Sequence, residues 1–157
     1  MENIKMICFD MDGTIADLYG VENWLEKLRA YDATPYIEAK PMCDMVELAD
    51  LLHIAQHRGI EVRIITWLSK ESTAEYDELV RITKRVWLEM MGLPYDHFHG
   101  VQYGATKADS IRKYLHDGEQ AILFDDNAKV RSGWHMGDAI DPNEYDICGV
   151  LREVLGL

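Results

Sequence analysis

The sequence has few cysteines, no long apolar stretch and few basic residues, and each shortage weighs against a class of protein. Its three cysteines, Cys8, Cys43 and Cys148, are widely spaced and form no Cys-x-x-Cys pair. An odd and scattered set favours reduced thiols and a cytoplasmic protein over a disulfide framework. No run approaches the roughly 18 apolar residues of a membrane helix, and no basic segment with a long apolar core opens the chain. We therefore expect neither a membrane protein nor a secretory leader.

Basic residues are outnumbered, because 16 Lys and Arg stand against 28 Asp and Glu and give a net charge of −12. This balance weighs against a general nucleic-acid partner, which needs clustered Lys and Arg to displace counterions. A small phosphorylated substrate stays compatible with it, since a metal ion and a lysine can reverse the field locally. The chain has 157 residues, is 48% hydrophobic and shows no repeat, so we expect one domain spanning residues 1–157.

The most informative segment is Asp10-Met11-Asp12-Gly13-Thr14, which directly follows the apolar run 4–9. Two carboxylates so close to each other, at the end of a buried strand, repel unless a cation or a shared proton is present. Oxygen ligands with no His or Cys nearby favour Mg²⁺ over zinc. A simple turn at the end of the strand is the alternative interpretation of this pair.

Three more polar groups follow predicted strands or begin a predicted helix. Thr66 ends the β-branched run 60–65, Lys107 stands at the expected start of a helix, and Asp125-Asp126 follow the apolar run 121–124. Ligands of an open parallel sheet bind outside the carboxyl ends of its strands, so we expect these groups to meet the first motif there. The alternative interpretations are that Thr66 is an ordinary loop hydroxyl, that Lys107 is an exposed lysine in the first turn of a helix, and that Asp125-Asp126 cap a helix.

Short apolar runs alternate with helical patterns along the chain, which predicts an α/β fold with a Rossmann-like, doubly wound, mainly parallel sheet. The expected helices span residues 41–58, 72–91, 106–117 and 147–155, and a short edge strand is expected at 138–140. The first helix would bury Met45, Val46, Ala49, Leu52 and Ala55, and the second would bury Tyr76, Leu79, Thr83, Val86, Trp87 and Met90.

Residues 15–40 separate the first motif from the first long helix. They are enough for about one amphipathic helix, whose apolar face would carry Val21, Trp24, Leu25 and Leu28. We therefore expect a minimal cap or small lid and an open site, unless a second subunit of a homo-oligomer covers it.

The ordered set of Asp10-x-Asp12-Gly13-Thr14, Thr66, Lys107 and Asp125-Asp126 resembles the motifs of the haloacid dehalogenase (HAD) superfamily of phosphohydrolases. The resemblance implies that Asp10 is the nucleophile and that Asp12 is the general acid and base, with its backbone carbonyl on Mg²⁺. It also implies that Thr66 and Lys107 hold the phosphoryl oxygens. The remaining implied roles are metal ligation by Asp10 and Asp125, and by Asp126 directly or through water.

A finer resemblance links the chain to the 5′(3′)-deoxyribonucleotidases and their small phage and bacterial relatives. It is carried by Lys84-Arg85-Val86-Trp87-Leu88 and by Gly92-Leu93, between the Thr66 motif and the Asp pair. Trp67 and Lys70 follow Thr66, where the family contacts the leaving group. Trp24 is a third candidate for substrate contact, because aromatic rings can stack on a nucleobase, although lid packing would explain it equally well.

These observations predict a Mg²⁺-dependent phosphomonoester hydrolase that uses an aspartyl-phosphate and acts on a small phosphorylated substrate such as a (deoxy)nucleoside monophosphate. Two alternatives stay open. The first is a HAD-like phosphate-binding or phospho-signalling domain without efficient turnover. The second is a phosphatase for a macromolecular substrate, which an open site would admit.

Overall fold

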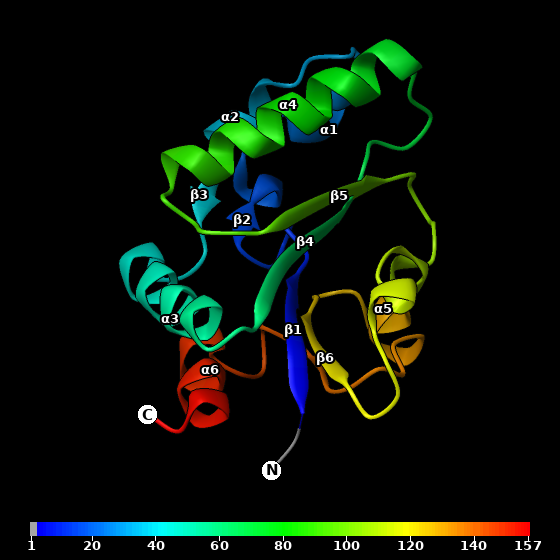
Figure 1. Ribbon diagram of the computed structural model, residues 1–157. Coiled ribbons are helices and arrows are strands. Elements are labelled where there is room, and N and C mark those ends of the chain that lie inside the picture. Colours follow the sequence, from blue (N-terminus) through cyan, green and yellow to red (C-terminus); the bar gives the residue numbers. More distant parts are fainter. Residues whose placement is uncertain (1–2) are drawn as a thin grey trace.

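The computed structural model describes residues 3–157 and shows a five-stranded parallel sheet with helices on both faces (Figure 1). The strand order is β5-β4-β1-β6-β7. The strands are β1 (Ile4–Phe9), β4 (Glu61–Trp67), β5 (His97–Val101), β6 (Gln120–Phe124) and β7 (Ala139–Ile140). Every pairing in this sheet is parallel, which confirms the predicted Rossmann-like, doubly wound architecture.

The central strand β1 is buried on both faces and separates two cores. Ile7 and Phe9 pack with the helices α3 (Met45–His57) and α6 (Ile147–Leu155), which lie together on one face of the sheet (Figure 1). Cys8, on the opposite face, belongs to the second core. A strand covered on both sides reads as a continuous apolar run, and this explains why β1, β4 and β6 are visible in the sequence.

The helix α4 (Ala74–Met90) forms where it was predicted, but it buries a different face. The side chains of Leu79, Val86 and Met90 are exposed, and the prediction that they face the core is wrong. The buried residues of α4 are Tyr76, Asp77, Val80, Lys84, Trp87 and Leu88. The cap is Thr73, whose hydroxyl accepts a hydrogen bond from the backbone N–H of Tyr76, so the helix begins two residues after the expected start at residue 72.

Two further element predictions need correction. The first long helix, α3, begins at Met45 behind the cap Asp44, whereas Pro41 belongs to the short strand β3 (Lys40–Pro41). Val46, predicted to be inward, is 74% exposed, because the helix starts later and turns its Leu48 and Leu52 face to the sheet. Residues 106–117 form two 3₁₀ turns in place of a helix, η2 (Lys107–Ser110) and η3 (Arg112–Tyr114).

The segment after the first motif forms a small cap over the carboxyl end of the sheet. Its two ends pair as an antiparallel ribbon of β2 (Ala16–Asp17) with β3. Between them lie η1 (Leu18–Gly20), α1 (Trp24–Arg29) and α2 (Thr34–Glu38), where a single helix was expected. Figure 1 shows α1 and α2 next to α4, at the end of the sheet toward which β1 points.

No helix within residues 3–157 has both the length and the apolar character needed to cross a bilayer. α5 (Ala128–Ser132), which follows β6, completes the set of helices in this part of the chain.

Candidate active site

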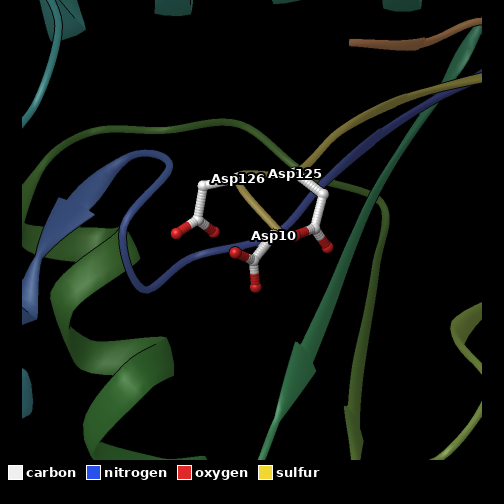
Figure 2. Close-up of side chains that lie close together, drawn as sticks. All are labelled: Asp10, Asp125 and Asp126. Carbon is white, nitrogen blue, oxygen red and sulfur yellow. The ribbon is translucent and has the colours of Figure 1, made fainter. Parts of the chain in front are cut away.

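Three carboxylates meet where two neighbouring parallel strands end. Asp10 follows β1 and Asp125-Asp126 follow β6, and the register pairs Phe9 with Phe124 directly before them. One oxygen from each of the three carboxylates lies within 4.8 Å of the others. Figure 2 shows the three side chains gathered at this point. The predicted convergence of the first and last motifs is therefore present in the fold.

Lys107 bridges two of these carboxylates. Its Nζ lies 2.8 Å from Oδ1 of Asp10 and 2.7 Å from Oδ2 of Asp125, and the lysine is only 3% exposed. Burial opposes a charge on this ammonium, but the two carboxylates outweigh burial and raise the pKa of Lys107. The lysine is therefore a buried cation fixed against the candidate nucleophile.

Thr14 links the two halves of the carboxylate cluster. Its Oγ1 lies 3.0 Å from Oδ2 of Asp10 and 3.3 Å from Oδ1 of Asp126, and it accepts a hydrogen bond from the backbone N–H of Asp126. The turn before it requires a glycine, because Gly13 has φ +81° and a Cβ there would lie 2.4 Å from Oδ2 of Asp126. The sequence places Gly13 and Thr14 in the first motif but predicts no contact for Thr14 itself.

The cluster carries more negative than positive charge. Burial, followed by repulsion from Asp10, raises the pKa of Asp125 to about 6, and burial together with Asp10 raises the pKa of Asp126 to about 7. One ammonium cannot neutralise three carboxylates, and carboxylate oxygens are the ligands that Mg²⁺ prefers. The donor set of Asp10, Asp125 and Asp126 thus fits a divalent cation.

Asp12 takes no part in this cluster through its side chain. Its carboxylate forms a second ion pair, in which Nζ of Lys84 lies 2.9 Å from Oδ2. Burial raises the pKa of Asp12, against the opposing effect of Lys84. Of the metal ligands suggested by the sequence, Asp12 could thus serve only through its backbone carbonyl, which is the atom that the family resemblance implies.

Lys84 is a site residue that the sequence reading did not identify as one. The same Nζ lies 2.6 Å from Oγ1 of Thr66, so Thr66 contacts the site through this lysine. A signal was present in the sequence, because Lys84 lies four residues after Val80 and three before Trp87, and both of those are buried. A lysine in the register of the inward face is a candidate for a buried ion pair.

A cavity of about 410 Å³ opens beside Asp12. Trp24, Trp67 and Lys70, the three residues predicted for substrate contact, all line it. The other aromatic residues of its wall are Tyr31, Tyr36, Tyr76 and Tyr103. The cavity lies between the cap helices and the loop that follows β4, so a bound group would be enclosed mainly by flat apolar surfaces.

A second hollow, of about 620 Å³, lies over the carboxylate cluster and is lined by Asp10, Lys107 and Asp125. Trp67 and Tyr103 line both spaces, with their ring centroids 5.1 Å apart, and so form the boundary between them. The arrangement places one carboxylate, Asp12, in the aromatic cavity and the nucleophile candidate in the other hollow.

The alternative interpretation of the Asp pair as a helix cap is wrong for α5. Asn127 caps this helix, since its side-chain oxygen accepts hydrogen bonds from the backbone N–H groups of Lys129 and Val130. Oδ1 of Asp125 accepts from the N–H of Asn127, and this bond fixes the orientation of the carboxylate. Asp125 and Asp126 are therefore left to face the cluster.

Comparison with known proteins supports the fold. No protein-family model matches the sequence, and no curated protein matches it. Among solved structures, the chain is similar to a hypothetical protein of Xanthomonas campestris, with a TM-score of 0.54 and 17% identical residues. The alignment covers 98% of this chain and 84% of that one. At this identity the likeness establishes a shared α/β fold.

Proposed function

We propose that the protein is a Mg²⁺-dependent phosphomonoester hydrolase of the HAD type, with Asp10 as its nucleophile. The observation that supports this most is the position of Asp10. Its carboxylate is paired with the buried ammonium of Lys107, inside a cluster of carboxylates, at the carboxyl end of the central strand. A carboxylate held in this way has a cation beside it for the phosphoryl oxygens.

In the first step, an oxygen of Asp10 forms a bond to phosphorus and the bond from phosphorus to the leaving oxygen breaks. Asp12, which lines the aromatic cavity, supplies the proton that the departing alkoxide needs. Lys107 would hold the phosphoryl oxygens during the transfer, whereas the hydroxyl of Thr66, predicted for the same role, is bonded to Lys84 and lines neither space. The products of this step are the free alcohol and an aspartyl-phosphate at Asp10.

In the second step, water attacks the phosphorus of the aspartyl-phosphate. Asp12, now unprotonated, accepts a proton from that water, and the bond between phosphorus and the Asp10 oxygen breaks. Inorganic phosphate leaves and both carboxyl groups return to their starting states. The same side chain thus serves as acid and then as base, as a two-step hydrolysis requires.

Asp10, Asp125 and Asp126 would hold the Mg²⁺ ion, with the backbone carbonyl of Asp12. When bound, the cation supplies positive charge against the phosphoryl oxygens and reduces the repulsion between phosphate and Asp10. The excess of carboxylates over ammonium groups in the cluster supports this assignment.

The aromatic cavity favours a leaving group with a flat ring, and we propose (deoxy)nucleoside monophosphates as the substrates. Trp24 and Trp67 offer indole faces for stacking on a base, and Lys70 adds a cation near the wall that Tyr103 forms. Replacing Trp67 with Ala should raise KM for nucleoside monophosphates more than for glycerol phosphate, whose leaving group has no ring.

The test is a panel of nucleoside monophosphates, sugar phosphates and phosphopeptides, assayed for released phosphate with and without EDTA. We expect turnover of at least one small monoester, complete loss in Asp10→Asn, and loss in EDTA that added Mg²⁺ reverses. Turnover that survives both treatments would refute the proposal. A stable phosphorylated Asp10 without phosphate release would favour the phospho-signalling alternative, and activity confined to phosphopeptides would favour a macromolecular substrate.

A further inference from the structure

Lys84 is a lysine in the middle of α4 whose ammonium is almost completely buried, with 1% of the residue exposed. All three of its N–H groups have acceptors. They donate to Oγ1 of Thr66 at 2.6 Å, to the backbone carbonyl of Trp67 at 2.9 Å and to Oδ2 of Asp12 at 2.9 Å. An ammonium has three donors, so this group is fully satisfied.

Two of these bonds anchor the ammonium and the third holds Asp12. Thr66 and Trp67 are the last two residues of β4, which is paired with β1 in the rigid sheet. The third bond fixes one oxygen of the Asp12 carboxylate. No hydrogen bond to the other oxygen, Oδ1, is seen within residues 3–157, and Asp12 lines the aromatic cavity. The free oxygen is therefore available to a group bound in that cavity.

Holding α4 on the sheet does not need this ammonium. Val80 and Trp87 flank Lys84 on the inward face and are themselves completely buried, and Trp87 donates to the carbonyl of Ala39. Burying a charge costs free energy, and a buried ion pair replaced as a whole by apolar side chains is often neutral or stabilising. A lysine here is better explained by what its ammonium holds than by helix packing.

We propose that Lys84 is a positioning residue for the general acid, fixing the Asp12 carboxylate so that its free oxygen faces the leaving group of the substrate. This inference rests on the proposed phosphatase function and adds a second lysine to it. Lys107 acts at the nucleophile and Lys84 acts at the proton donor, each from a different element of the fold.

The test uses two substrates that differ in how much they need a general acid. Glycerol phosphate releases an alkoxide and needs one, whereas p-nitrophenyl phosphate releases a stable phenolate and needs little help. The parameter is kcat/KM, because it reports the steps up to formation of the aspartyl-phosphate. In Lys84→Met we expect kcat/KM for glycerol phosphate to fall about 100-fold, the scale of a misplaced catalytic group. For p-nitrophenyl phosphate we expect a loss of less than about tenfold.

Two control variants make the result specific. Asp12→Asn should show the same discrimination between substrates more strongly, because it removes the acid itself. Trp87→Phe removes a buried hydrogen bond of the same helix, one turn away, without touching Asp12. It should lower the melting temperature, and any change in kcat/KM should be equal for both substrates.

Equal losses for both substrates in Lys84→Met, or a discrimination matched by Trp87→Phe, would overturn the positioning role and leave the phosphatase assignment intact. If Lys84→Met does not fold, Lys84→Gln keeps two amide donors without the charge, and the same comparison of substrates applies. A wild-type protein without turnover of these two esters or of any nucleoside monophosphate would overturn both proposals. The two kinds of failure are thus distinguishable in one set of assays.

Discussion

Replacing Lys107 with methionine should destabilise the protein strongly. The substitution keeps most of the side-chain volume but removes the ammonium that lies 2.8 Å from Asp10 and 2.7 Å from Asp125. The side chains of this group are almost fully buried, with 2% of Lys107, 9% of Asp10 and 1% of Asp125 exposed. Two carboxylates would then face each other without the cation between them.

The magnitude follows from the burial. Removing one partner of a buried ion pair costs about 3–5 kcal/mol of unfolding free energy, because the remaining charge stays desolvated. In a chain of this size each kcal/mol corresponds to about 2–4 °C, so the melting temperature should fall by roughly 6–20 °C. Metal should offset part of this loss, since a divalent cation binds the folded state and supplies the missing positive charge.

The assay is denaturant unfolding of the wild type and Lys107→Met at pH 7.5, in EDTA and again with millimolar Mg²⁺. The matched control is Arg112→Met, which breaks the Arg112–Asp109 pair. That pair is also 2.8 Å long, but its side chains are 62% and 65% exposed. The control should change the unfolding free energy by at most about 1 kcal/mol. A loss for Lys107→Met no larger than that of the control would refute the reasoning, as would an equal loss with and without Mg²⁺.

Three further predictions concern the Mg²⁺ ion, the turn at Gly13 and His99 in the edge strand β5. Millimolar Mg²⁺ should raise the melting temperature of the wild type, and scans of Asp126→Asn should show a smaller rise because one candidate ligand is gone. Gly13→Ala should lower both the melting temperature and the Mg²⁺ response, since its Cβ would collide with Asp126 and φ is +81°; an unchanged response would contradict this. Burial and then Arg63, whose Nη1 lies 3.1 Å from Nε2 of His99, lower the pKa of His99 below 6.5. The unfolded chain thus binds the proton more readily, so stability should decrease as pH falls below 6.5, and pH-dependent unfolding of His99→Gln should show a shallower decrease.

The strands and the meeting of the motifs could be predicted because each depends on local sequence. The runs that became β1, β4 and β6 are mainly apolar, as is usual for strands covered on both faces. Once these strands are parallel neighbours, the residues directly after them lie at one edge of the sheet. Asp10 and Asp125 therefore needed no long-range information beyond the fold class.

The helix faces could not be predicted from periodicity, because α4 carries two candidate stripes. Leu79, Val86 and Met90 make an apolar stripe that faces solvent, whereas the inward stripe contains a lysine at position 84. Judged by hydrophobicity alone, the stripe with Leu79 is the better candidate for the buried face. The stripe with Lys84 is buried instead because the lysine finds its partners there in the folded protein. Those partners, Asp12 and Thr66, lie 72 and 18 residues away in the chain.

Carboxylate partners explain why the site carries two buried lysines in a chain with a net charge of −12: Asp12 pairs with Lys84, and Asp10 and Asp125 pair with Lys107. The phosphatase chemistry proposed here needs carboxylates in two roles, and a buried carboxylate without a cation loses its proton only at high cost. Lys107 lies against Asp10, the candidate nucleophile, and Lys84 is placed so that it can hold Asp12 in the neighbouring cavity. The lysines come from η2 and α4, so neither pairing depends on the other's element. The two cations serve different groups in the same steps, so the loss in Lys84→Met should depend on the leaving group and the loss in Lys107→Met should not. The same pattern of losses in both variants would argue that the cluster is only structural.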